Sequence, residues 1–430
     1  MNSQTDYPLF TVIIPQKDRA EYLIHTLRTC MIQDYPNFEI IVSDDCSEDN
    51  SVEVVRELMK TDSRIKLFAH NQHFGMRDNF EFALNQVRPG YVLALGGDDG
   101  LVPGCIWRMY EILSSTKREL LTWTPAGFVY PDSEGGKNIF YVKRKKNCGV
   151  KFIKSEIFLN KIANSFFYLI DECPMFYVKG VASTALVDRV KSRTQDHCFY
   201  HCPTPDGFSG VVLAGEVEDY VFTYEPLSIN GNTKKSHGKN YHRTDKKSIE
   251  EAQQFFNDNK KRKMHTELAS QQYSPLATLM TADFLLTAQD LPGWPGKFEP
   301  ISIESLIHSS FKFMENSNFE KENLVRELNI IKEIAKQHGL LDLFNHLLKT
   351  TKIKIVSKEP VYGFLITHSI RFEGTELGIN NIFDASLATN FVYNFYNKIS
   401  FKEIIDLIRN TGRILFRNKK YKTEHFPNIN

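Results

Sequence analysis

Four short β-rich runs alternate with helical patterns across the first hundred residues, and this alternation constrains the fold more than any other feature. The runs Leu9–Ile14, Phe38–Val42, Arg64–Phe68 and Tyr91–Leu95 are apolar and bounded by turn residues, which indicates buried strands. Between them, apolar residues recur at helical spacing. Strands that alternate with helices through short connections predict βαβ units and a parallel sheet covered by helices.

Three of these strands are followed by polar loops, at Pro15–Arg19, Ser43–Ser47 and Gly96–Gly100. Because open α/β sheets bind ligands at the carboxyl ends of their strands, we expect the three loops to form one site. The sequence has neither a G-x-G-x-x-G after the first strand nor a P-loop motif. A nucleotide bound here would therefore be held by carboxylates and a metal rather than by a glycine-rich cradle.

The last of these loops places Asp98 and Asp99 side by side after two glycines. Adjacent carboxylates repel each other, so a fold that keeps them at a ligand-binding edge is expected to balance them with a cation. Mg²⁺ and Mn²⁺ prefer carboxylate oxygens as ligands. The alternative is a solvated Asp-Asp-Gly turn, which is the common interpretation of this tripeptide in isolation.

Length, charge and cysteine content exclude several classes of protein. A chain of 430 residues predicts two or three domains. Its 53 basic and 52 acidic residues nearly cancel, so charge gives no reason to expect a nucleic-acid partner. Seven scattered cysteines indicate reduced thiols in the cytoplasm. Without a signal-peptide pattern or an apolar run of ~18 residues, the protein is expected to be soluble or to lie on a membrane surface, such as the inner face of the plasma membrane.

Four blocks carry a resemblance to a known family: Val12–Arg19, Ile41–Ser47, Asn71 with Gly75, and Leu95–Asp99. In this order and spacing they resemble the family 2 glycosyltransferases of the GT-A fold, over roughly the first 230 residues. The resemblance implies a Rossmann-like mixed sheet flanked by helices. It also implies an inverting transfer of a sugar from a nucleotide-diphosphate sugar, which we expect to be UDP-linked.

The resemblance also implies roles for individual residues. Asp99 would hold Mn²⁺ or Mg²⁺, and Asp98 would face the ribose or the donor sugar. Asp45 would bind the base. The remaining nucleotide-sugar contacts are expected from Pro15, Lys17, Arg19, Arg77 and His237. The chain departs from the usual pattern at Gln16–Asp18 and at Cys46, which leaves the base and the sugar open.

Pro203 to Gly207 resembles the later carboxylate motif of the family, and Asp206 falls on its catalytic base. An inverting transfer needs a carboxylate that takes the proton of the acceptor hydroxyl. The alternative is a helix N-cap aspartate. Glu216 and Glu218 are the fallback candidates. The loop of Lys234, Lys235 and His237 is expected either to close over the diphosphate or to be a solvated basic linker.

Two further stretches remain open to alternatives. Residues 196–202 contain two histidines and two cysteines, but their spacing does not match a usual structural zinc site and favours a packed segment. The aromatic residues between Phe166 and Tyr177 are expected in the core or as a sugar platform.

Composition shifts after residue 238, so we expect a GT-A domain over residues 1–238 and a mostly helical domain over 239–430. The second domain would shape the acceptor side or form a homo-oligomer contact. Near its end, an apolar helical pattern at 401–408 precedes a basic tail at 413–422. This arrangement is typical of peripheral contact with an anionic membrane, and the alternative is a helix docked on its own domain.

The sequence therefore predicts a metal-dependent, inverting glycosyltransferase that acts on a glycan or lipid-linked glycan acceptor in surface-polysaccharide synthesis. One alternative is a nucleotidyltransferase-like enzyme, although the loop Gln16–Arg19 lacks the glycines such enzymes need. The other alternative is a non-catalytic glycan-binding scaffold on the same fold. It is disfavoured because the carboxylates of all four motif positions are present.

Overall fold

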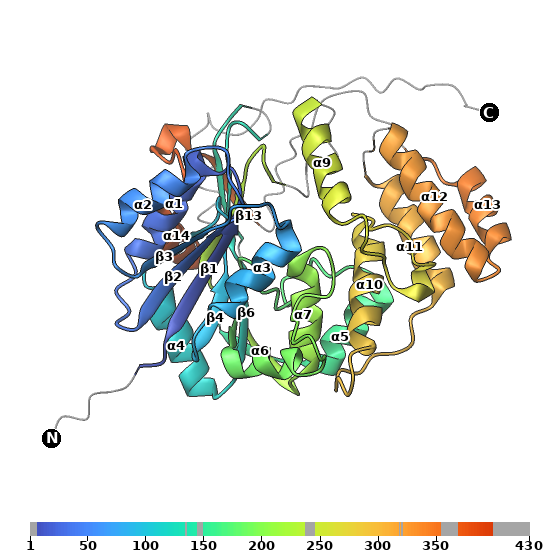
Figure 1. The fold of residues 1–430 in the computed structure, drawn as a ribbon, viewed down its shortest axis with the longest axis horizontal. Coiled ribbons are helices and arrows are strands. Elements are labelled where there is room, and N and C mark those ends of the chain that lie inside the picture. Colours follow the sequence, from blue (N-terminus) through green and yellow to red (C-terminus); the bar gives the residue numbers. More distant parts are fainter. Residues whose placement is uncertain are drawn as a thin grey trace.

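The computed structural model describes residues 7–133, 136–143, 149–236, 246–317, 319, 321–353 and 369–398. Its main sheet has eight strands, which lie in the spatial order β3 (Ile65–Ala69), β2 (Phe38–Asp44), β1 (Phe10–Gln16), β4 (Tyr91–Ala94), β10 (Gly180–Ser183), β6 (Leu120–Trp123), β11 (Asp219–Thr223) and β9 (Val150–Lys154). Figure 1 shows this sheet beside a group of helices. The predicted α/β class, with a mixed sheet and a mostly helical C-terminal region, is confirmed.

The first four strands pair in parallel, as their alternation with helices predicted. Beyond them, β10 runs antiparallel to both β4 and β6, so the complete sheet is mixed. Helices cover the sheet on both faces, and every residue of β1 is buried for this reason. Val12 and Ile14 enter the core on one face, and Ile13 enters the core on the other.

The helices of the first half are short segments between these strands. They are α1 (Ala20–Met31), α2 (Ser51–Met59), α3 (Met76–Asn85), α4 (Cys105–Thr116), α5 (Ser155–Ser165), α6 (Thr184–Lys191) and α7 (Pro205–Gly215).

A second, five-stranded sheet has the order β13 (Ser369–Glu373), β8 (Ile139–Lys143), β7 (Ala126–Val129), β12 (Ser228–Asn232) and β5 (Gly100–Leu101). Strands β7 and β8 pair in antiparallel fashion. Strand β11 does not continue into β12. The extended segment breaks around Pro226, which has no N–H to donate, and β12 crosses to the second sheet beside β5. This crossing carries the segment after β12 to the Asp98 turn.

The C-terminal helices are α9 (Lys246–Asp258), α10 (Ala277–Gln289), α11 (Ile303–Glu315), α12 (Lys321–Gln337), α13 (Leu341–Thr350) and α14 (Ile382–Lys398). Helix α10 is buried on nearly all sides, because it packs between α7 and α11. In the described residues, no helix is long and apolar enough to cross a membrane.

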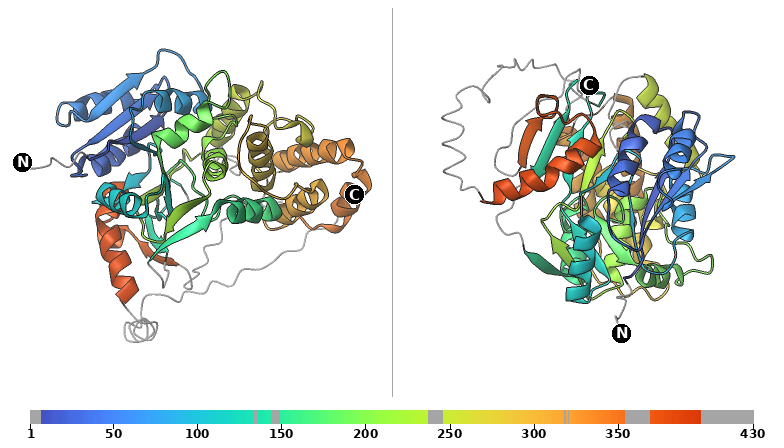
Figure 2. Two further views of the ribbon diagram at one scale, coloured as in Figure 1. Left: turned by 90° about the horizontal axis from the view of Figure 1, so that it is seen from below. Right: turned by 90° about the vertical axis from the view of Figure 1, so that its left-hand side faces the viewer.

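The last described segment returns to the N-terminal half. Strand β13 pairs with β8, and α14 packs against α1, β5 and β12. In Figure 2 the red α14 lies away from the orange helices and beside the first half of the chain. The domain boundary at residue 238 stays a prediction. Although β13 and α14 follow residue 238 in the sequence, they pack against elements that precede it.

Asp283 on α10 supports a prediction about pH and stability. Burial raises the pKa of its carboxyl to about 6. The folded protein therefore holds this proton more tightly than the unfolded chain, and the free energy of unfolding is expected to fall by up to about 3 kcal/mol between about pH 4 and pH 6. Asp283→Asn should remove this decrease, since an amide oxygen still accepts the His265 N–H at 2.7 Å.

Urea unfolding of the wild type and of Asp283→Asn across this pH range measures the difference. The exposed Asp342, in the first turn of α13, provides a matched control, and Asp342→Asn should keep the wild-type pH dependence. Equal pH dependence in all three proteins would contradict the prediction.

Candidate active site

The polar loops after β1, β2 and β4 meet at the carboxyl edge of the parallel strands, where ligands bind in open α/β sheets. The residue pairing places Pro15 opposite Ser43 and Gln16 opposite Asp44. The side chain of Gln16 donates a hydrogen bond to Asp44. The predicted convergence of the loops is therefore present.

The Asp99 carboxylate is fully buried and joins the turn to β12. Its Oδ2 accepts the Gly96 N–H at 2.7 Å, and its Oδ1 accepts the Gly231 N–H at 2.8 Å. Burial, followed by the charge of Asp98, raises its pKa to about 7. A Cβ at position 231 would lie 1.7 Å from the Asp98 carbonyl oxygen, so this approach requires glycine. Both Asp99 oxygens thus accept backbone N–H groups within the protein, and its role as metal ligand stays a prediction.

The Asp98 carboxylate faces the other way, toward charged and hydroxyl groups. Its Oδ2 accepts hydrogen bonds from Arg19 Nη1 at 3.1 Å and Thr233 Oγ1 at 3.0 Å, with Ser236 Oγ at 3.4 Å. All three bonds end on one oxygen, and Oδ1 takes no part in the hydrogen bonds of the described residues. The metal site stays a prediction, and the geometry favours Asp98 over Asp99 as its ligand.

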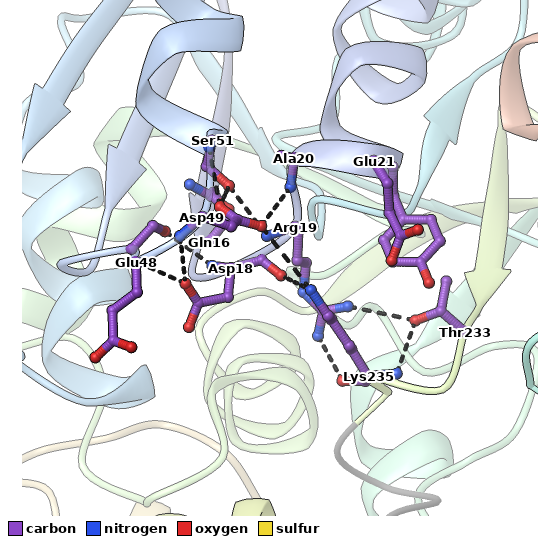
Figure 3. Close-up of polar contacts among 12 residues, drawn as sticks. Gln16, Asp18, Arg19, Ala20, Glu21, Glu48, Asp49, Ser51, Thr233 and Lys235 are labelled. Atoms are coloured by element: carbon purple, nitrogen blue, oxygen red, sulfur yellow. Dashed lines mark hydrogen bonds and ion pairs between the residues drawn. The ribbon is translucent and has the colours of Figure 1, made fainter. Parts of the chain in front are cut away.

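Arg19 ties the loop after β1 to the segment after β12. Its Nη2 donates to the Lys235 carbonyl oxygen at 2.7 Å, and Lys235 Nζ donates back to the Asp18 carbonyl oxygen. Figure 3 shows Arg19, Thr233 and Lys235 pointing toward one another from the two segments. The Arg19 guanidinium consequently lies beside Asp98, and the Lys235 ammonium lies beside the loop of Asp18, where cationic groups suit an anionic diphosphate. His237 lies outside the described residues.

Asp45 and Lys17 both lie beside His73, which belongs to the loop before α3. The Asp45 carboxylate is buried and accepts the Phe74 N–H at 2.6 Å and the Gly75 N–H at 3.0 Å, with His73 Nδ1 at 2.8 Å. Lys17 Nζ is 3.5 Å from the same histidine nitrogen. Base recognition by Asp45 stays a prediction. The structure adds that this carboxylate anchors the loop before α3.

Arg77 does not reach this group of residues. Its guanidinium donates to the Tyr200 carbonyl oxygen, to Cys198 Sγ and, at 2.5 Å, to Asp78 Oδ1. These partners fix it to the segment before α7. The prediction of Arg77 as a nucleotide-sugar ligand is therefore not supported by its contacts in the described part of the chain.

Asp206 is the second residue of α7, and its Oδ1 is buried without a hydrogen-bond partner among the described residues. Burial raises the pKa of this carboxyl, against smaller opposing effects of the Gly207 N–H and the Tyr168 hydroxyl. A buried unpaired oxygen costs about 1–3 kcal/mol, so its retention in the fold calls for an explanation. The geometry suits a group that accepts a proton, or a hydrogen bond from a hydroxyl group, of a ligand.

Tyr177 places its hydroxyl beside the Gly96–Asp99 turn, and the sequence predicted no specific role for it. Burial raises the pKa of its phenol, and the charges of Asp99, Asp98 and Asp206 raise it further. A Cβ at Gly96 would lie 2.5 Å from the Tyr177 hydroxyl, so the glycine admits the ring. The only signal in the sequence was its place in an aromatic-rich stretch.

The fallback bases lie at the other end of α7. Glu216 Oε2 accepts from Arg193 Nη2 at 2.8 Å, and the exposed Glu218 pairs with Lys154 at 2.7 Å. A helix of eleven residues separates them from Asp206 by about 15 Å. Their ion pairs and distance make them poor substitutes for Asp206.

In the histidine- and cysteine-containing segment 196–202, the individual side chains contact different partners. Cys198 lies 3.4 Å from Glu81 Oε2, His201 Nε2 lies 3.1 Å from the Cys198 carbonyl oxygen, and Cys202 interacts with Asp283. Across the described residues, no group of three or more His, Cys, Asp or Glu side chains is placed to hold a metal ion. A metal at Asp98 would thus depend on oxygens from the donor itself, which fits Mg²⁺, commonly bound by one or two carboxylates plus phosphates.

Comparison with known proteins places this geometry in context. The model of glycosyl transferase family 2 matches residues 11–164. An uncharacterized glycosyltransferase of Haemophilus influenzae is 27% identical over 139 residues, which cover 32% of this chain and 54% of that protein. The GalNAc(5)-diNAcBac-PP-undecaprenol beta-1,3-glucosyltransferase of Campylobacter jejuni is 38% identical over 101 residues, which cover 23% of this chain and 32% of that protein.

Among solved structures, S. aureus TarS 1-349 in complex with UDP-GlcNAc aligns with a TM-score of 0.44 and 13% identity, over 80% of this chain and 91% of that one. The chain thus spans about a third to a half of the length of the two curated relatives that it matches.

Proposed function

We propose that this protein, whose residues 11–164 match the model of glycosyl transferase family 2, transfers a sugar from a nucleotide-diphosphate sugar, of the UDP type, to a glycan or lipid-linked glycan. The observation that carries the proposal is the contrast between two carboxylates. Asp98 is balanced by Arg19, whereas Asp206 has a buried Oδ1 with no hydrogen-bond partner among the described residues. An enzyme that separates a departing anion from a proton-accepting base needs two such environments.

On the donor side, Asp98 is the residue that would hold Mn²⁺ or Mg²⁺. When bound there, the cation would neutralise charge on the departing nucleoside diphosphate. Arg19 adds fixed positive charge next to the same oxygen, and the Lys235 ammonium lies at the Asp18 carbonyl oxygen, in the loop that carries Arg19. Asp99 keeps the turn in place through its bonds to Gly96 and Gly231.

On the acceptor side, Asp206 serves as the base of a single displacement. The acceptor oxygen forms a bond to the anomeric carbon while the bond from that carbon to the diphosphate oxygen breaks, which inverts the configuration. The hydroxyl proton passes to Asp206. A raised pKa improves this carboxylate as a base, since a proton acceptor works best when its pKa approaches the working pH.

The wider setting belongs to the same proposal. The Campylobacter relative is named for an undecaprenol-linked glycan substrate. This supports a lipid-linked acceptor and a role in surface-polysaccharide synthesis. Residues 1–238 would bind the donor, and the helices after residue 238 would shape the acceptor side, because α10 packs directly on α7, which carries Asp206.

Nucleotide-dependent thermal stabilisation tests the function. We expect UDP with Mn²⁺ to raise the melting temperature more than GDP, ADP or CMP with Mn²⁺, and more than UDP alone. At a ligand concentration 100-fold above Kd the expected stabilisation is about 2.7 kcal/mol. Absence of any shift with all four nucleotides would contradict the proposal and favour the glycan-binding scaffold. Nucleotide transfer without sugar transfer would favour the nucleotidyltransferase.

A further inference from the structure

The side chain of His73 joins two carboxylates that come from distant parts of the chain. Its Nδ1 lies 2.8 Å from Asp45 Oδ2, directly after β2, and its Nε2 lies 2.8 Å from Asp258 Oδ2, at the end of α9. The Asp45 side chain is 4% exposed, the Asp258 side chain is 19% exposed and the His73 side chain is 28% exposed. This bridge is therefore largely shielded from water, and it connects the candidate active site to α9.

The geometry of the bridge requires a protonated ring. A neutral imidazole has one N–H, so one of its two nitrogens would direct a lone pair at a carboxylate oxygen. Both nitrogens can donate only when the ring carries a positive charge. Among the described residues, the charged groups that face the ring are Asp45, Asp258 and Lys17, whose Nζ lies 3.5 Å from Nδ1. With the ring protonated, two positive charges balance two negative ones.

The bridge lies beside the backbone that holds Asp45. The N–H groups of Phe74 and Gly75, the two residues after His73, both donate to the Asp45 carboxylate. At Gly75 the backbone has a φ of +86°, and an added Cβ would lie 3.5 Å from Asp258 Cβ. The loop before α3 is therefore in close contact with the end of α9, and His73 adds a charged link across this contact.

A second ion pair connects the same two parts of the chain. Arg262 Nη2, in the segment after α9, lies 2.8 Å from Asp78 Oδ1, in the first turn of α3. An arginine–aspartate pair keeps its charges between pH 5 and 8, whereas histidine changes its charge in that range. The dependence of this contact on protons consequently comes from His73.

We propose that Asp258 is a positioning residue for the donor, and that it acts through the protonated ring of His73 on the Asp45 carboxylate. The proposal rests on the proposed function and on the prediction that the donor base binds at Asp45. An N–H of the base binds this carboxylate best when the carboxylate is held in one orientation. When the ring loses its proton, the Nε2 lone pair faces Asp258, the link to α9 is lost, and UDP binds less tightly.

Calorimetric titration with UDP and Mn²⁺ at pH 6 and at pH 8.5 tests the proposal. Asp258→Ala removes the carboxylate and keeps the Cβ beside Gly75. At pH 6 it is expected to weaken UDP binding about three- to fivefold, the upper range for a partly exposed ion pair. At pH 8.5 it should have no effect, because the wild type has already lost the bridge. In a His73→Gln background, Asp258→Ala should have no further effect at either pH, since it acts through the ring.

Asp258→Asn distinguishes this role from simple packing. The asparagine amide can donate to Nε2 of a neutral ring while Nδ1–H still donates to Asp45, so the bridge no longer needs the second proton. This variant is expected to bind UDP like the wild type at pH 6, and about three- to fivefold more tightly than the wild type at pH 8.5. The matched control is Asp290→Ala, which removes another carboxylate that lies 2.8 Å from a histidine, His265. It should bind UDP like the wild type at both pH values.

Hydrogen–deuterium exchange reports on the bridge without nucleotide. At pH 6 the Phe74 and Gly75 amides are expected to exchange faster in Asp258→Ala than in the wild type, and equal exchange would overturn the proposal. Melting temperatures show whether each variant is folded. If the wild type binds UDP and Asp258→Ala binds it equally at pH 6, the positioning role is overturned and the proposed function stands. The proton-dependent bridge is also overturned if the ratio of the two Kd values is the same at both pH values. If the wild type binds no nucleotide, the proposed function fails and the positioning role fails with it.

Discussion

Asp206→Asn is expected to lower the rate of sugar transfer by about 10²–10⁴-fold, the usual contribution of a positioned general base. The asparagine keeps the size of the side chain and removes its ability to take the acceptor proton. Donor binding should remain, because the Asp98 group is formed by other segments. Initial rates with a UDP-sugar and a glycan acceptor, together with the thermal shift by UDP, separate the two effects.

A matched control for this variant is Asp342→Asn, another aspartate in the first turn of a helix, which is exposed on α13. Its activity should equal that of the wild type. The acidic limb of the pH–rate profile, which reports the base, should disappear with Asp206→Asn. Full activity in Asp206→Asn would remove Asp206 as the base and leave it as a residue of the α7 N-terminus.

Asp98→Asn is expected to abolish the effect of Mn²⁺ on UDP binding and to reduce transfer by about 10²–10³-fold, the range found when one group that stabilises transition-state charge is removed. The variant should stay folded, since an amide can still accept from Thr233 and Arg19. Titration of UDP with and without Mn²⁺, followed by calorimetry, measures the coupling between metal and nucleotide.

Asp99→Asn separates the two neighbouring aspartates. An amide has one acceptor oxygen, so either the Gly96 or the Gly231 N–H loses its partner, at a cost of about 1–3 kcal/mol in the free energy of unfolding. The folded fraction should still show the effect of Mn²⁺ on UDP binding. If Asp99→Asn abolishes that effect and Asp98→Asn does not, the metal ligand is Asp99, as the sequence resemblance implied.

Much of the fold was predictable because it depends on local patterns. The runs that became β1, β2, β3 and β4 are short, apolar and bounded by turns, so their identity and parallel pairing follow from spacing. The loops that follow β1, β2 and β4 meet because the carboxyl ends of parallel strands lie at the same edge of the sheet. The position of Asp206 at a helix start was also local, since Pro205 suits the first helical turn.

The division of roles between the aspartates was not predictable in this way. Asp98 and Asp99 have the same chemistry and adjacent positions, and their difference arises from Gly231, which donates to Asp99 from 132 residues away. A residue pattern does not show which of two carboxylates will accept a hydrogen bond from a distant strand. The contacts of Arg77 were not predictable for a similar reason, because its partners lie on the segment of Cys198 and Tyr200, and its role in binding a nucleotide sugar stays a prediction.

The sequence by itself determined the α/β class, the edge of the sheet at which chemistry is expected, and the match of residues 11–164 to the model of glycosyl transferase family 2. Only the tertiary structure decided that both Asp99 oxygens accept backbone N–H groups, that the Tyr177 hydroxyl lies beside the Gly96–Asp99 turn, and that α14 packs against β5 and β12. The physical reason is how far apart in the sequence the interacting residues lie. Strand and helix patterns repeat within a few residues, whereas hydrogen-bond saturation and burial depend on groups that only the folded chain brings together.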